Sequence, residues 1–62
     1  MIYEEETYVE LQDGRKGLIV LVRLDNRTQY DIELANGVLT TVYHEEVARP
    51  VKTQRNKSSL EG

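Results

Sequence analysis

The sequence contains no cysteine, tryptophan or phenylalanine, and it has one proline and one histidine in 62 residues. Without cysteine there is no disulfide bond, no thiolate ligand for zinc and no thiol nucleophile. Secreted domains of this size usually depend on disulfide bonds for stability. We therefore expect the protein to reside in the reducing cytoplasm.

Long apolar runs are also missing. No stretch approaches the roughly 18 apolar residues of a membrane-spanning helix. Residues 1–6 are acidic, whereas an export signal begins with basic and then apolar residues. We therefore expect no export signal and no association with a membrane.

The length of the chain limits what it can enclose. A chain of 62 residues forms one domain at most, and a domain of this size hides only about 60% of its unfolded surface on folding. The 39% of hydrophobic residues suffice for one small barrel or sheet but not for a deep substrate pocket. We expect neither a buried active site nor a cofactor.

Charge is distributed unevenly along the chain. Residues 1–46 contain ten acidic and four basic residues, whereas residues 47–62 contain one acidic and four basic residues. The polar segment from Lys52 onward has no apolar periodicity, which is typical of a disordered tail. The sequence predicts an acidic amino-terminal extension over residues 1–6, a folded body over 7–51 and a flexible basic tail over 52–62.

The folded body has the two-residue period of β-strands, with turn residues between the periodic segments. Five strands are expected, over residues 7–11, 18–24, 29–34, 38–43 and 48–51, with one short 3-10 turn over residues 44–47. Residues 18–24 are nearly all apolar, so this strand is expected to be central and covered on both faces for part of its length. Pro50 cannot donate a backbone hydrogen bond, which predicts that the last strand lies at an edge.

Glycine marks two tight turns. In the segment QDGRKG, both Gly14 and Gly17 are expected to supply the positive φ that a tight reversal needs. Asn36-Gly37 lies between apolar flanks and is a strong hairpin signal, because a type I′ turn needs positive φ at both central residues.

The register of the Asn36-Gly37 hairpin stays open at this stage. A two-residue loop would pair Tyr30 with Tyr43 on the inward face. A bulge would shift the pairing by one residue and turn Val38, Thr40 and Val42 inward instead.

These segments resemble the SH3-like barrels of the KOW and Tudor kind. The resemblance covers residues 7–51 and rests on the glycine turn at 13–17, the strand LIVLV, the half-buried QYDIEL, the Asn36-Gly37 hairpin and the turn HEEV before a short strand. It implies an all-β, five-stranded SH3-like barrel, similar to small stand-alone barrels encoded by bacteriophages and plasmids. An OB-like or Sm-like barrel, or an open three-stranded sheet, would share this pattern of short strands.

Members of this group bind nucleic acid, peptides, RNA polymerase or the ribosome, or they dimerise, so the residues must discriminate between these functions. The acidic body, the edge strand and the small core favour docking on a larger protein, such as the transcription or translation machinery that the resemblance implies. The candidate protein-binding residues are Asp31, Glu33, Glu45, Glu46, Tyr8 and Tyr43. Homodimerisation through the barrel edge is a further alternative.

Nucleic-acid binding is the other alternative, because the hairpin tip and the tail are basic. Its candidate residues are Arg15, Lys16, Arg49, Lys52, Arg55 and Lys57. The acidic body disfavours it, since neutralisation of phosphates supplies most of the affinity for nucleic acids.

Catalytic and metal-binding patterns are sparse. His44 beside Glu45 and Glu46 is the one arrangement with the residue types of a general base or a metal site. Adjacent side chains diverge in an extended segment, and no second histidine or cysteine completes the set. Four tyrosines are also too few for an aromatic cage, because some of them are expected to lie in the core. We expect a protein that is not an enzyme and holds no metal.

Overall fold

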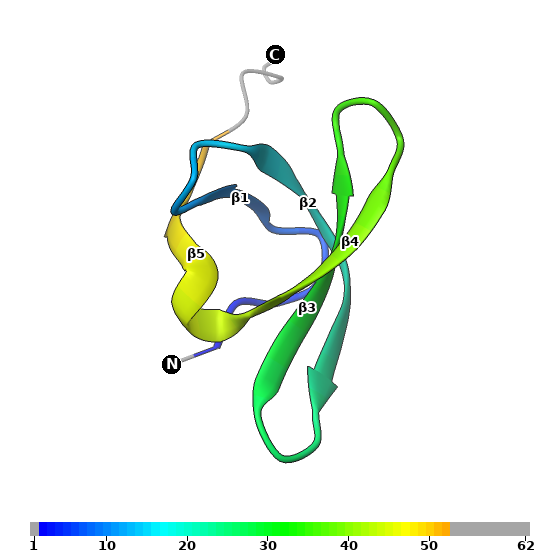
Figure 1. Cartoon of the computed structure of the whole chain (residues 1–62), viewed down its shortest axis with the longest axis vertical. Helices are drawn as coiled ribbons and strands as arrows, with labels where there is room; N and C mark the ends of the chain where they lie inside the picture. Colours follow the sequence, from blue (N-terminus) through cyan, green and yellow to red (C-terminus); the bar gives the residue numbers. More distant parts are fainter. Residues whose placement is uncertain (1, 53–62) are drawn as a thin grey trace, which may run out of the picture.

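The structure is a computed structural model that describes residues 2–52. It contains five antiparallel strands and one 3-10 turn (Figure 1). The elements are β1 (Tyr8–Leu11), β2 (Lys16–Leu24), β3 (Thr28–Leu34), β4 (Leu39–Tyr43), the 3-10 turn η1 (His44–Glu46) and β5 (Val47–Pro50). The all-β class, with five strands and a 3-10 turn before the last, is confirmed. The predicted tail from residue 53 onward lies outside the described residues.

The strands form one sheet in the order β4-β3-β2-β1-β5. β4 and β5 are therefore at opposite edges, although only η1 separates them in the chain. In a flat sheet, four interstrand spacings of about 4.8 Å would keep these edges roughly 19 Å apart, farther than a three-residue turn reaches. The sheet must coil, and Figure 1 shows η1 carrying the chain from β4 back toward β1. No helix among residues 2–52 is long and apolar enough to cross a membrane.

The turns of the first and third hairpins share one geometry. In the first, the amide of Gly14 donates to the carbonyl of Leu11, and the amide of Leu11 donates to the carbonyl of Arg15. In the third, the amide of Gly37 donates to the carbonyl of Leu34, and the amide of Leu34 donates to the carbonyl of Val38. Each glycine has positive φ, but Asn36 does not. Both are thus type I turns closed by a glycine bulge, and the predicted type I′ turn at Asn36-Gly37 is wrong.

This turn sets the register of β4. Val42 lies opposite Tyr30, and Thr40 lies opposite Ile32. Val42 is 3% exposed and Tyr43 is 37% exposed. The bulged alternative is therefore confirmed for Thr40 and Val42, and the Tyr30–Tyr43 pair of the two-residue loop does not form.

β2 departs from its prediction at a bulge. Its pairing with β3 shifts between Ile19 and Leu21, so the inward side passes from Ile19 to Val22. Val20 and Leu21 are both 39% exposed. The expectation that part of this strand is covered on both faces is wrong at Val20 and Leu21, because residues 2–52 form a single sheet with no second layer over its outer face.

Gly17 is a strand residue rather than a turn residue. Its φ is not positive, in contrast to Gly14. A Cβ at this position would lie 2.5 Å from Cγ2 of Ile32 and 2.7 Å from the carbonyl oxygen of Glu33. Glycine is needed here because β2 and β3 approach too closely for any side chain.

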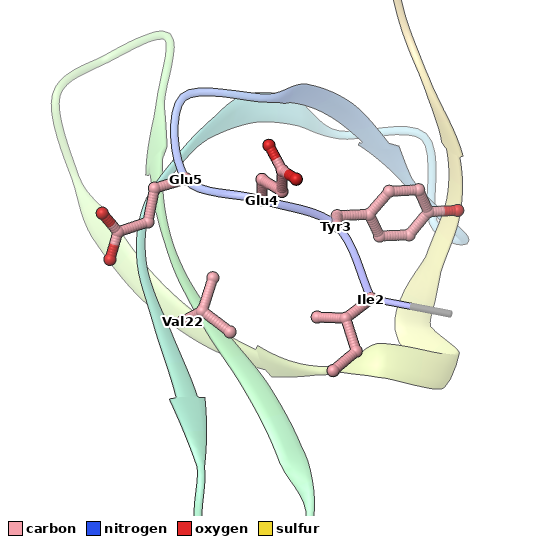
Figure 2. A pocket seen from close by; sticks show the side chains of 5 residues that line it. All are labelled: Ile2, Tyr3, Glu4, Glu5 and Val22. Atoms are coloured by element: carbon pink, nitrogen blue, oxygen red, sulfur yellow. The ribbon is translucent and has the colours of Figure 1, made fainter.

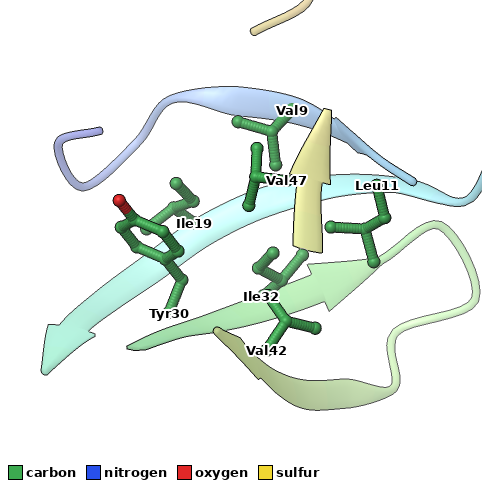
Figure 3. Close-up of a cluster of buried hydrophobic side chains, with 7 residues drawn as sticks. All are labelled: Val9, Leu11, Ile19, Tyr30, Ile32, Val42 and Val47. Atoms are coloured by element: carbon green, nitrogen blue, oxygen red, sulfur yellow. The ribbon is translucent and has the colours of Figure 1, made fainter. Parts of the chain in front are cut away.

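The core lies on the concave side of the sheet and receives side chains from all five strands (Figure 3). Its members are Val9, Leu11, Ile19, Tyr30, Ile32, Val42 and Val47, with Tyr3, Val22 and Leu34 packed against them. Tyr30 is the largest fully buried side chain. Six of the seven buried members are aliphatic, and the hydroxyl of Tyr30 is the one polar side-chain group among them.

Candidate functional site

The amino-terminal segment is attached to the body at two places, first by the Glu6 amide, which donates to the carbonyl of Ile19, and then by Tyr3. A turn with Glu6 at positive φ lets the amide of Thr7 donate to the carbonyl of Glu4. The amide of Tyr3 then donates to the hydroxyl oxygen of Tyr30 over 3.1 Å. The Tyr3 ring lies beside Tyr30, with ring centroids 6.0 Å apart, and beside His44 at 5.5 Å.

This contact closes one end of the core. The hydroxyl oxygen of Tyr30 lies 2.6 Å from Nδ1 of His44. Since the Tyr3 amide already donates to that oxygen, the hydroxyl hydrogen is free to be donated to Nδ1. Tyr3 is a residue that the sequence pattern misses, because residues 1–6 carry no strand or helix periodicity from which a partly buried position could be inferred.

A shallow hollow lies beneath this segment (Figure 2). It has a volume of about 540 Å³ and is lined by Ile2, Tyr3, Glu4, Glu5 and Val22. Ile2 and Val22 form its apolar part, and Figure 2 shows the Glu4 and Glu5 carboxylates pointing away from them. The hollow is open to solvent, so it does not have the enclosed form of a substrate pocket.

The convex side of the sheet carries a set of aligned side chains that we call the outer face. Directly paired residues of neighbouring antiparallel strands share a face of the sheet. Tyr8 pairs with Leu18, Leu18 with Glu33, and Glu33 with Leu39, which makes one row across four strands. The next rows are Leu21, Asp31 and Thr41, and then Arg23, Gln29 and Tyr43.

The carboxylate of Asp31 is held by hydrogen bonds within this face. Its carboxylate accepts two hydrogen bonds from the Arg23 guanidinium, at 3.1 and 2.9 Å, and one from the Thr41 hydroxyl at 2.8 Å. These bonds, with Arg23 contributing most, lower the pKa of Asp31 below its ordinary value. Asp31 therefore offers little free charge to a partner.

Glu33 differs from Asp31. Its carboxylate has no ion-pair partner within residues 2–52, and its side chain is exposed. Leu18 and Leu39 flank it in the row, and Leu39 is 63% exposed. The centre of the outer face is thus one free carboxylate between apolar side chains.

Tyr43 ends the outer face at the start of η1. The Arg27 guanidinium lies over its ring, 3.7 Å from the centroid, and also forms an ion pair with Glu45. The Glu46 carboxylate accepts a hydrogen bond from the backbone amide of Tyr43 over 3.1 Å. Glu45 and Glu46 therefore serve contacts within the chain rather than the row around Glu33.

The His44-Glu45-Glu46 arrangement does not converge. His44 is directed to Tyr30, Glu45 to Arg27 and Glu46 to the amide of Tyr43. Within residues 2–52, no three histidine, cysteine, aspartate or glutamate side chains are close enough together to hold a metal ion.

The predicted nucleic-acid residues are dispersed and partly neutralised. Arg15 is paired with Asp13 at 2.8 Å, and Arg49 is paired with Glu10 on the outer face. Lys16 borders an open hollow of about 330 Å³ between the first and third turns. Lys52 follows β5, and the remaining two predicted residues, Arg55 and Lys57, lie outside the described residues.

Comparisons with protein-family models, with curated proteins and with solved structures found no match to the chain. The class of the protein is therefore defined by its own geometry: a small, all-β protein with a single coiled, five-stranded antiparallel sheet.

Proposed function

We propose that this chain is a non-catalytic SH3-like binding module that docks on a larger protein through its outer face. The SH3-like assignment is supported by β1 pairing with both β2 and β5, and by the 3-10 turn that joins β4 to β5. The observation that carries the function is the row of Tyr8, Leu18, Glu33 and Leu39, which places a free carboxylate between the half-buried Leu18 and the exposed Leu39.

Such a surface has the composition of a protein interface. Apolar and tyrosine side chains supply the area that is removed from water, and a single charge in their centre selects a partner with a basic group at the matching place. Leu21 and the bulged Val20 extend the apolar part along β2. The transcription or translation machinery would supply a partner of this kind, since proteins that bind RNA carry basic patches.

The test is a comparison of two charge reversals in a pull-down from the native host, followed by affinity measurements with the recovered partner. Glu33→Lys is expected to weaken binding at least tenfold, because it opposes the partner's basic group. Glu5→Lys makes the same change in net charge away from the outer face and is expected to bind as the wild type does. Equal binding by Glu33→Lys and wild type at low salt would exclude the outer face as the docking site.

The nucleic-acid alternative draws its support from Lys16 at the hollow between the two turns. Arg15 contributes less because Asp13 neutralises it. This alternative predicts that labelled single-stranded or duplex nucleic acid is shifted at about 50 mM salt, and that the shift weakens steeply as salt is raised. Absence of a shift with micromolar protein would remove it.

A further inference from the structure

We propose that two copies of this chain pair through β4, edge to edge, to form one continuous antiparallel sheet. The proposal rests on the open edge of β4 and is independent of docking at the outer face. β4 is an edge strand, and within residues 2–52 no other segment pairs with its far side. Figure 1 shows the β3–β4 hairpin projecting away from β1 and β5, which leaves this edge accessible.

The hydrogen-bond pattern identifies the free groups. Leu34 and Val38 form a hydrogen-bonded pair at the turn, and such pairs alternate with non-hydrogen-bonded pairs along an antiparallel ladder. The pairs Ile32–Thr40 and Tyr30–Val42 are then hydrogen-bonded, whereas Leu39, Thr41 and Tyr43 direct their backbone groups away from β3. The bond from the Tyr43 amide to Glu46 agrees with this direction.

Glu46 limits where a second strand can add. It already occupies the edge amide of Tyr43, which leaves both backbone groups of Leu39 and Thr41 as the open part of the edge. A two-fold axis beside Thr40 sets Leu39 of each copy opposite Thr41 of the other. These are two hydrogen-bonded pairs that use all of the open groups and leave Tyr43 outside the ladder.

The chemistry of β4 favours a second copy as the occupant. The strand LTTVY has no charge and no proline, so it lacks the lysine, proline or bulge that usually protects a sheet edge. Self-pairing therefore brings no like charges face to face. The free carboxylates of Glu33 in the two copies would be three strand spacings apart and displaced by two residues along the strands, roughly 16 Å, which exceeds the Debye length of about 8 Å at physiological salt.

The pair would also enlarge the proposed docking surface. Leu39 and Thr41 lie on the outer face, so a second β4 continues that face across the interface without covering it. The area buried by two edge strands is small, and dimerisation should therefore be weak and depend on concentration.

The experiment measures the mass of the full-length chain by sedimentation equilibrium from about 10 μM to 1 mM, a range suited to weak interfaces. The wild type is expected to rise from the mass of one chain toward that of two. Thr41→Pro removes the edge amide but no β3–β4 hydrogen bond, and it should stay monomeric. Thr41→Val is the matched control: it also loses the Thr41 hydroxyl but keeps the amide, and it should dimerise like the wild type.

Amide exchange of the wild type gives a second measurement that needs no variant. Exchange at the Leu39 and Thr41 amides should slow as concentration rises, whereas the Tyr43 amide, which Glu46 already binds, should change little. A single monomer mass over the whole range would overturn the proposal. So would a dimer in which these two amides stay unprotected, or one that Thr41→Pro leaves intact, because each outcome places the contact elsewhere.

Discussion

The Tyr30 hydroxyl oxygen lies 2.6 Å from Nδ1 of His44, and the same oxygen accepts a hydrogen bond from the backbone amide of Tyr3. The Tyr30 side chain, including this hydroxyl, is fully buried. One atom therefore joins three separate parts of the chain: the amino-terminal segment, the centre of β3 and η1. Because a buried polar group without a partner is costly, this junction should contribute to stability as well as to shape.

Removal of the hydroxyl should show that contribution. Tyr30→Phe leaves the Tyr3 amide and Nδ1 of His44 without their common partner, so we expect the free energy of unfolding to fall by about 1–3 kcal/mol. Urea denaturation followed by circular dichroism measures the change. Tyr43→Phe is the control, since the exposed Tyr43 hydroxyl has no hydrogen-bond partner within residues 2–52, and it should alter stability by less than about 0.5 kcal/mol. Equal effects of the two variants would contradict this role of Tyr30.

The register of β4 makes an equally direct prediction. Val42 is buried opposite Tyr30, whereas its neighbours in the strand face outward. Val42→Ala should therefore lower the free energy of unfolding by about 2 kcal/mol through lost apolar burial and a residual cavity. Leu39→Ala removes a larger side chain from an exposed site and should change stability by less than about 0.5 kcal/mol. The reverse order would mean that the strand is shifted by one residue.

Local sequence signals predict the strands better than their registers. The turn at Asn36-Gly37 is where the sequence places it, but glycine alone takes positive φ there. The Asn36 side chain accepts a hydrogen bond from the amide of Val38, which supports the bulged loop. Both loops fit the same residues, so burial of Val42 from elsewhere in the fold decides between them.

The candidate site depends on this same long-range information. The pattern identifies Asp31 and Glu33 as outward residues of one strand, and they do lie on the outer face. It cannot show that Arg23 neutralises Asp31 and leaves Glu33 free, because that contact requires the β2–β3 register. The bulge at Val20 is hidden for a similar reason. Every residue in LIVLV is apolar, so the sequence does not show which of the two alternating sets of side chains faces the core.

The two kinds of glycine can be separated by mutation. Gly17→Ala would press a methyl group against Ile32 and the Glu33 carbonyl, so it should destabilise the fold by about 1–3 kcal/mol. Gly37→Ala has open space around the new Cβ and should be affected only through its positive φ, at roughly 1–2 kcal/mol.

A second substitution distinguishes the two causes. Asparagine tolerates positive φ better than alanine does, so Gly37→Asn should recover part of the loss at that position. Gly17→Asn should be worse than Gly17→Ala, because the obstacle there is steric. Thermal denaturation of the four variants measures both comparisons, and recovery by asparagine at Gly17 would argue against the close approach of β2 and β3.

The Arg23–Asp31 contact predicts how stability depends on pH. Hydrogen bonds from Arg23 and then Thr41 lower the pKa of Asp31 in the folded protein. A carboxyl group with a lowered folded pKa binds protons more readily when unfolded, so its contribution is complete above the ordinary aspartate pKa of about 3.9 and is lost as the pH falls through the folded value. Asp31→Asn should therefore be less stable than wild type near neutral pH, and the difference should shrink below about pH 4.

Urea titrations at a series of pH values measure that difference in stability between Asp31→Asn and the wild type, with Asp25→Asn as the control because Asp25 has no ion pair within residues 2–52. A difference that stayed constant from neutral to acidic pH would mean that the charge of Asp31 contributes nothing to the fold.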